Sequence, residues 1–109
     1  MSFEYTLKIL SNKSIPLISN LEKVLDGGCL TYFHRPDGQF LIKDPSISSS
    51  WNYDISIKKE THGDFHIALV GWSLPIYQVF KEALKGQIYE IYDDDADEKI
   101  SIENLFRRP

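Results

Sequence analysis

The sequence predicts an α+β fold in which a mixed, mainly antiparallel sheet of about six to seven strands carries two helices on one face. Several segments alternate apolar and polar residues, which is typical of strands with one buried face. Two other segments repeat apolar residues at helical spacing and end at glycine. Turn motifs rich in Pro, Gly and Asp separate neighbouring strand segments, so we expect hairpins within the sheet.

The first half of the chain predicts a strand, a helix and a hairpin, in that order. Apolar and polar residues alternate over 3–9, which indicates the strand. Ser14 is the expected N-cap of the helix, and Gly27 is its expected stop signal. The segment 29–43 forms the hairpin, because Arg35–Gly38 at its centre has Pro and Gly where a tight turn favours them.

A loop at 44–50 and one further strand come before the second half of the chain. Alternation predicts this strand over Trp51–Lys58, with its even-numbered side chains on a solvent-exposed face. After a turn, another alternating strand leads into a helix that begins at Ser73. The chain then forms a hairpin of two strands around an acidic loop. The last three elements span 65–72, 73–85 and 88–106, with Gly86 after the end of the helix.

The two helix segments align without gaps at an offset of 59 residues, with Ser, Pro, Leu and Gly identical at four positions. The same offset places the turn at 35–38 over residues 94–97. The pattern therefore indicates that 3–43 and 62–102 are two copies of a strand-helix-strand-strand unit. The alternative is that two unrelated helices have converged on the same common start and stop residues. In either case each helix connects strands that we expect to be parallel, which makes the sheet mixed.

Length and composition favour one domain over 1–109 with an ordinary hydrophobic core. The chain has 109 residues, of which 42% are hydrophobic. Its single cysteine, Cys29, excludes an internal disulfide and a multi-cysteine metal site. No apolar stretch approaches the ~18 residues of a membrane span, and the N-terminus lacks the apolar region of a secretory signal. We therefore expect a soluble, cytoplasmic protein with no membrane partner.

Acidic residues are concentrated in one segment. The formal net charge is −4, but Glu90–Glu103 alone holds seven acids and one base, a net charge of −6, and the rest of the chain carries +2. A dense negative patch repels phosphate, which argues against a nucleic-acid ligand, and it attracts a basic protein. The alternative is a solvated loop that charge keeps soluble.

The strand alternation also assigns a mixed set of side chains to the sheet face opposite the helices. Such a face is a plausible docking surface, because aromatic residues are enriched at interfaces. The alternative for Trp72 is packing over the start of the second helix, which we favour. The assigned residues are Glu4, Thr6, Lys8, Asn52, Asp54, Ser56, His66, Ala68, Val70, Trp72, Lys99, Ser101 and Glu103.

No catalytic, cofactor or metal motif is present. The sequence lacks a Gly-x-Ser-x-Gly elbow and both Gly-rich phosphate-binding patterns. The acidic segment fails as an EF-hand because Glu98 occupies the position that requires Gly. His62, Asp64 and His66 have ligand spacing, but a turn at Gly63 splays them. We expect no cofactor, no metal and no enzyme; the alternatives are a small enzyme using His66 or His34 with a carboxylate, and a homo-oligomeric scaffold.

The size, the order of strands and helices and the acids of Glu90–Glu98 make the chain resemble bacterial toxin-immunity proteins of contact-dependent growth inhibition. The resemblance implies stoichiometric inhibition of a basic cognate toxin, often a nuclease, in the cytoplasm. The acidic hairpin would occupy the toxin's phosphate-binding surface, with two tyrosines as anchors or, alternatively, as core residues. The predicted partner-binding residues are Tyr89, Glu90, Tyr92, Asp93, Asp94, Asp95, Asp97 and Glu98.

Overall fold

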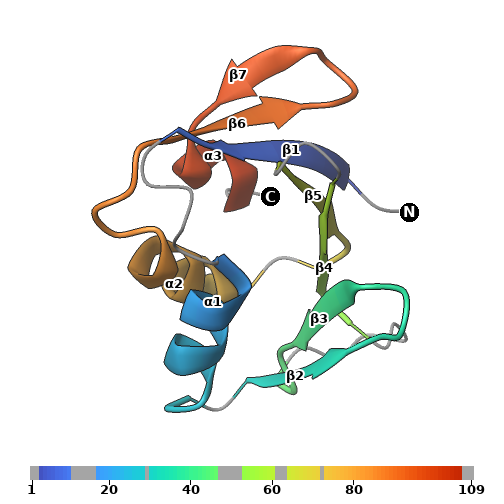
Figure 1. Ribbon diagram of the computed structural model, residues 1–109, viewed down its shortest axis with the longest axis vertical. Helices are drawn as coiled ribbons and strands as arrows, with labels where there is room; N and C mark the ends of the chain where they lie inside the picture. The colour runs from blue at the N-terminus through green and yellow to red at the C-terminus, as the bar shows by residue number, and fades with distance from the viewer. Residues whose placement is uncertain are drawn as a thin grey trace.

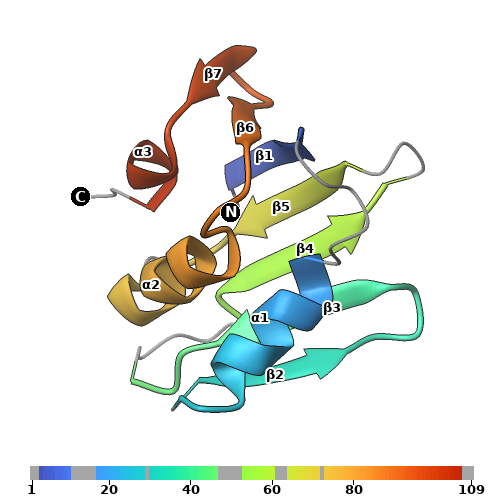
Figure 2. The same ribbon diagram turned by 60° about the vertical axis from the view of Figure 1, so that its left-hand side comes forward.

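The computed structural model describes residues 3–10, 17–28, 30–46, 53–60, 64–71 and 73–106. Within these ranges, seven strands form one sheet in the order β2-β3-β4-β5-β1-β6-β7. The helices all lie on one face of this sheet (Figures 1 and 2). In chain order the elements are β1 (Phe3–Ile9), α1 (Leu17–Leu25), β2 (Thr31–His34), β3 (Gln39–Lys43), β4 (Ile55–Lys59), β5 (Phe65–Leu69), α2 (Leu74–Ala83), β6 (Tyr89–Asp93), β7 (Glu98–Ile100) and α3 (Ile102–Phe106).

The predicted α+β class, the size of the sheet and the two longer helices on one face are confirmed. All pairings between the described strands are antiparallel, so the expected parallel neighbours do not occur. The strands that each helix connects do run in the same direction. They are not neighbours, however, because β1 lies between β5 and β6, and three strands lie between β1 and β2.

The hydrophobic core lies between the sheet and the helices. Strand residues such as Leu7 and Ile67 and helix residues such as Leu21 and Phe80 are fully buried there. Burial of each such side chain stabilises the fold by roughly 1.5–3 kcal/mol. The helical spacing of Leu17, Leu21 and Leu25 explains why α1 buries one face along its whole length.

The predicted start of the second helix is confirmed. Ser73 is the N-cap of α2, and its Oγ accepts a hydrogen bond of 3.2 Å from the backbone N–H of Ile76. Gly86, after the end of α2, has a φ of 81°, the left-handed conformation that glycine adopts most readily. α1 ends before Gly27 as expected, whereas its predicted cap, Ser14, lies outside the described residues.

The end of the last hairpin differs from the prediction. The strand predicted to continue to residue 106 ends at Ile100, and α3 follows. Ser101 caps this short helix, since its Oγ accepts a hydrogen bond of 3.1 Å from the N–H of Asn104. Ile102 and Leu105, three residues apart, reach the core from one side of α3. The placement of Ser101 and Glu103 on the open sheet face is therefore wrong, and Glu103 accepts a hydrogen bond from Tyr77 instead.

The strand predicted over Trp51–Lys58 begins only at Ile55 in the described residues, and Trp51 lies outside them. Asp54, which the alternation predicts to be on a solvent-exposed face, is fully buried at 0% exposure. Ser56 follows the alternation but is buried as well. The burial is tolerated because the Asp54 carboxylate accepts a hydrogen bond of 2.7 Å from the N–H of Asp44, a contact that local periodicity does not indicate.

The turns of the β2–β3 and β6–β7 hairpins each contain one residue with a positive φ, and these two residues are 59 positions apart. Gly38 in the β2–β3 turn has a φ of 93°, and Asp97 in the β6–β7 turn has a φ of 52°. Both values lie in the left-handed region, which costs an L residue energy that glycine does not incur. The hairpins join the sheet in opposite order, because the earlier strand, β2, is outermost in the first and the later strand, β7, is outermost in the second.

We expect Asp97→Gly to raise the free energy of unfolding by about 0.5–1 kcal/mol, because it relieves the left-handed strain at this position. Urea denaturation measures the change. Asp97→Asn is the matched control: it removes the charge but keeps a side chain of similar shape that tolerates this conformation, so stability should change little. Equal gains in the two variants would show that charge, not backbone conformation, limits the stability of the turn.

Candidate functional site

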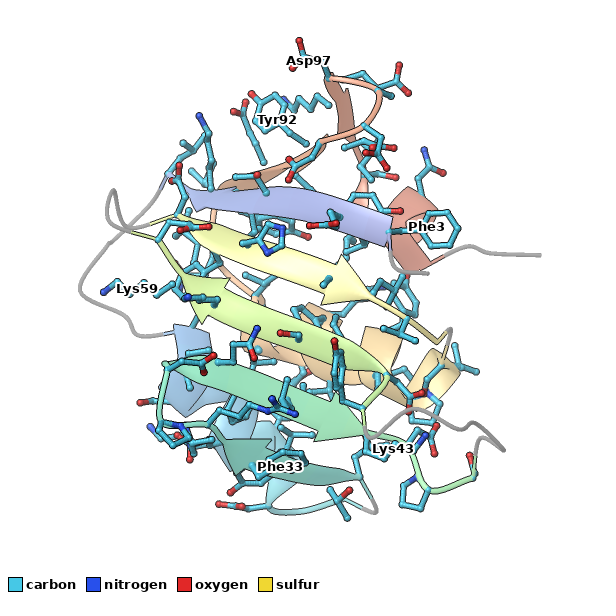
Figure 3. All side chains as sticks on the ribbon, turned by 90° about the vertical axis from the view of Figure 1, so that its right-hand side faces the viewer. Phe3, Phe33, Lys43, Lys59, Tyr92 and Asp97 are labelled. Carbon is cyan, nitrogen blue, oxygen red and sulfur yellow. The ribbon has the colours of Figure 1, made fainter. Side chains whose placement is uncertain are left out.

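The sheet face opposite the helices is lined by polar side chains (Figure 3). The strand register confirms that several predicted residues share this face, since residues directly across from each other on neighbouring strands point to the same side of a sheet. Thr6, for example, lies between His66 on β5 and Tyr92 on β6, and Lys8 lies across from Glu90. The confirmed members are Glu4, Thr6, Lys8, Ser56, His66, Ala68 and Lys99.

One group of contacts attaches the acidic turn to β1 and β5. Thr6 Oγ1 donates a hydrogen bond of 2.7 Å to Asp94 Oδ1, and the N–H of Asp94 donates one of 3.1 Å to the carbonyl of Glu4. His66 Nε2 lies 2.9 Å from Glu4 Oε1 and 3.9 Å from Asp94 Oδ2. Asp94 is thus held within the fold and is only partly available to a partner.

A second group of contacts fixes the side chains that β6 places on the open face of the sheet. Tyr92 donates a hydrogen bond of 2.7 Å to Glu90 Oε1, and Lys99 Nζ donates one of 3.0 Å to Glu90 Oε2. The hydrogen bond from Tyr92, followed by that from Lys99, holds the pKa of Glu90 below its usual value. The Lys8 Nζ lies 5.4 Å from the centre of the Tyr92 ring, a cation–π distance. The charge of Glu90 is therefore balanced internally, and Tyr92 is held in one orientation.

The turn itself depends on Asp93. Its Oδ1 accepts hydrogen bonds from the N–H groups of Asp95 at 2.9 Å and Ala96 at 3.2 Å. The carbonyl of Asp93 also accepts a hydrogen bond of 2.7 Å from the N–H of Asp97. Asp93 therefore shapes the turn, as an Asp at the start of a turn commonly does.

Three acids remain exposed at the tip of the hairpin: Asp95, Asp97 and Glu98. Among the residues that the structure describes, none pairs with the carboxylates of these three. Figure 3 shows Asp97 at the far end of the hairpin, with Tyr92 below it on the open face. We call Asp95, Asp97 and Glu98 the acidic tip. It is the part of the hairpin whose negative charge is not offset by the fold.

The two predicted anchor tyrosines lie on opposite faces of β6. Tyr89 shares a face with the buried Ile91 and packs against the hydrophobic core, which matches the packing alternative. Burial, and then the nearby Glu103 carboxylate, raise the pKa of Tyr89 above its usual value. Of the two, only Tyr92 lies on the open face beside the acids.

The two described histidines each contact a carboxylate on the surface. His66 pairs with Glu4 as above, and His34 Nε2 lies 3.1 Å from Glu22 Oε2. A cavity of about 310 Å³ lies between the end of α1 and the start of α2, lined mostly by apolar residues such as Val24 and Val79, and neither histidine lines it. No group of three metal-ligating side chains occurs in the described ranges, and His62 lies outside them.

A buried polar cluster, missed in the sequence, joins β3, β4 and the start of α2. Asp44 Oδ2 accepts a hydrogen bond of 2.6 Å from the hydroxyl of Ser73, the N-cap of α2. Asp54 Oδ2 accepts one of 2.7 Å from the N–H of Asp44, and Lys43 Nζ lies 3.5 Å from Asp54 Oδ1. In the sequence, only the N-cap at Ser73 is indicated by a local pattern. Asp44 and Asp54 come together through the pairing of β3 with β4, which no local pattern indicates. These hydrogen bonds satisfy the buried groups, which gives the cluster a structural role.

Comparisons with known proteins identify no family: no family model matches the chain, and no curated protein or solved structure is significantly similar to it. Within the described part of the chain, no helix has the length and apolar character needed to cross a bilayer. The function is therefore proposed from the geometry of the open face and the acidic tip.

Proposed function

We propose that the protein is a cytoplasmic inhibitor of the immunity type, which binds a basic cognate toxin through the β6–β7 hairpin. The observation that carries this proposal is the acidic tip, three carboxylates without partners among the described residues, presented on a hairpin that the sheet holds in place. The partner is a protein with a cationic surface, such as a nuclease that binds phosphate groups with Lys and Arg.

The internal contacts of the hairpin support this function. Asp93 shapes the turn, and Asp94 attaches it to β1, so the tip needs little ordering when a partner arrives. Charges at an exposed position chiefly increase the rate of association, because they attract an oppositely charged surface over several ångströms. The same charges would slow the approach of nucleic acid, which favours a protein partner.

Tyr92 is the aromatic contact that the geometry favours. Its ring is half-buried, lies on the open face and is held by Glu90 and Lys8. An aromatic side chain with a fixed orientation gives contact area at a small entropic cost, so residues of this kind often dominate binding energy. Tyr89 is excluded from this role because it packs against the core.

A pull-down from the cells that produce the protein, followed by kinetics with the purified partner, tests the proposal. We expect a basic partner whose activity falls to zero at a one-to-one ratio. The variant Asp95→Asn/Glu98→Gln should slow association about fivefold at low ionic strength and flatten its dependence on salt. The charges of Asp93 and Asp94 are unsuitable targets, because their loss also disturbs the turn.

The matched control is Glu60→Gln/Glu82→Gln, which removes two exposed acids away from the hairpin and changes the net charge equally. This control should associate at nearly the wild-type rate, since its positions are remote from the proposed interface. An acidic partner, or equal slowing by the tip variant and the control, would contradict the proposal.

A further inference from the structure

The two outermost strands of the described sheet differ in how well they are protected from pairing with another strand. β7 has three residues, two of them charged, and its first residue, Glu98, belongs to the acidic tip. Charged side chains and short length keep an edge strand from adding a neighbour. β2 has no acid, lysine or proline over Thr31–His34, and its register against β3 is continuous. β2 is therefore the less protected of the two edges, and it lies at the end of the sheet opposite the acidic tip.

Contacts with α1 and β3 hold β2 in place. The hydroxyl of Tyr32 donates a hydrogen bond to Asp26, just after α1, and His34 contacts Glu22 within α1. Both rings also pack against Phe40, with centroids 5.4 and 5.0 Å away. An edge fixed in this way can accept a further strand without a large loss of conformational entropy.

The hydrogen bonds of the hairpin show which backbone groups of β2 point outward. The N–H of Arg35 donates a bond of 2.8 Å to the carbonyl of Gln39, so this pair is hydrogen-bonded. Hydrogen-bonded pairs alternate along an antiparallel ladder, which places Phe33 in the next such pair, with Leu41. The N–H and C=O groups of Tyr32 and His34, between these pairs, therefore point away from β3.

We infer that β2 pairs with β2 of a second copy of this chain, antiparallel about a two-fold axis at Phe33. In this register Tyr32 of each copy lies across from His34 of the other. The outward groups of the two residues then form four backbone hydrogen bonds across the interface. The two sheets join into one, and the acidic tips lie at its two far ends.

The absence of charge on β2 and the exposure of Phe33 favour a second copy of this chain as the partner of this edge. A two-fold axis places identical residues near each other, which is unfavourable for a charged strand but not for β2. Phe33 is 42% exposed on the open face and would face Phe33 of the other copy in a close, non-hydrogen-bonded pair. Arg35 would face Thr31, so no like charges oppose each other. A basic partner, in contrast, finds no acid on β2 to attract it.

Sedimentation of the full chain from micromolar to submillimolar concentration tests the inference. We expect a reversible monomer–dimer equilibrium for the wild type. His34→Pro removes an outward N–H without removing a bond to β3, so it should raise the dissociation constant at least tenfold above that of His34→Ala. His34→Ala is the matched control, because it also loses the contact with Glu22 but keeps the N–H.

Phe33→Glu is a second variant, which places like charges opposite each other and should also shift the equilibrium toward monomer. Hydrogen exchange adds an independent measurement: the N–H groups of Tyr32 and His34 should gain protection as dimer forms, whereas that of Phe33 is protected throughout. A wild-type chain that stays monomeric, or a dimer that His34→Pro and Phe33→Glu leave intact, would overturn the inference. So would protection of Tyr32 and His34 that appears only when a basic partner is added, which would indicate a foreign strand at this edge.

Discussion

Gly71→Ala should lower the free energy of unfolding by about 2–3 kcal/mol, because the added methyl group has no room. A Cβ at Gly71 would lie 2.6 Å from Asp54 Oδ1 and 3.3 Å from its carboxyl carbon. Asp54 cannot easily move aside, since it is fully buried and its other oxygen accepts a hydrogen bond of 2.7 Å from the N–H of Asp44. Urea denaturation followed by circular dichroism measures the loss.

Two comparisons isolate the cause of this loss. Gly27→Ala, where the nearest atom to a new Cβ is 3.9 Å away, should change stability by less than about 0.5 kcal/mol. In an Asp54→Ala background, Gly71→Ala should cost much less than in the wild type, because the carboxylate that it meets is gone. An equal cost in the two backgrounds would show that the clash with Asp54 is not the reason glycine is needed at position 71.

Elements with a strong local signal were predictable from the sequence. The alternation in Phe65–Leu69 and the spacing of Ile76, Phe80 and Ala83 reflect burial against the core, and both elements form where they were expected. α3 was missed because the Lys99–Glu103 segment also alternates, and a Ser cap with two apolar residues three positions apart is too short a signal to outweigh alternation. Strand order was not predictable, since nothing local indicates that β1 lies between β5 and β6.

The candidate site was predictable as a segment but not in its detail. The sequence indicates an acidic hairpin, and the period of two already places Tyr89 and Tyr92 on opposite faces. Which acids remain unpaired depends on β1 as a neighbour, because Thr6 and the carbonyl of Glu4 hold Asp94. The carboxylates available to a partner are therefore those of the acidic tip, and not those in the middle of the acidic run.

Asp44→Asn should lower the free energy of unfolding by about 2 kcal/mol at neutral pH, and this difference should disappear in acid. Burial raises the pKa of Asp44, but hydrogen bonds from Ser46 and Ser73, together with Lys43, outweigh burial and hold its pKa below the ordinary value of 3.8. The folded chain thus binds this proton less tightly than the unfolded chain. The stabilisation is fully present above the unfolded pKa and is lost as the pH falls through the folded pKa.

In Asp44, Oδ1 accepts hydrogen bonds from the N–H and the hydroxyl of Ser46, and Oδ2 accepts one from the hydroxyl of Ser73. The asparagine variant keeps the shape of this side chain but lacks the charge and one of the two acceptor oxygens. Urea denaturation of both proteins from pH 7 down to about pH 3 should therefore show two curves that stay apart down to the unfolded pKa of 3.8 and converge only as the pH falls below it. Asp95→Asn at the acidic tip is the control, and its difference from the wild type should stay small at every pH because this carboxylate is exposed. A difference for Asp44→Asn that persists unchanged in acid would mean that the amide disturbs packing around Ser73, and that ionisation of Asp44 contributes nothing to holding β3 against α2.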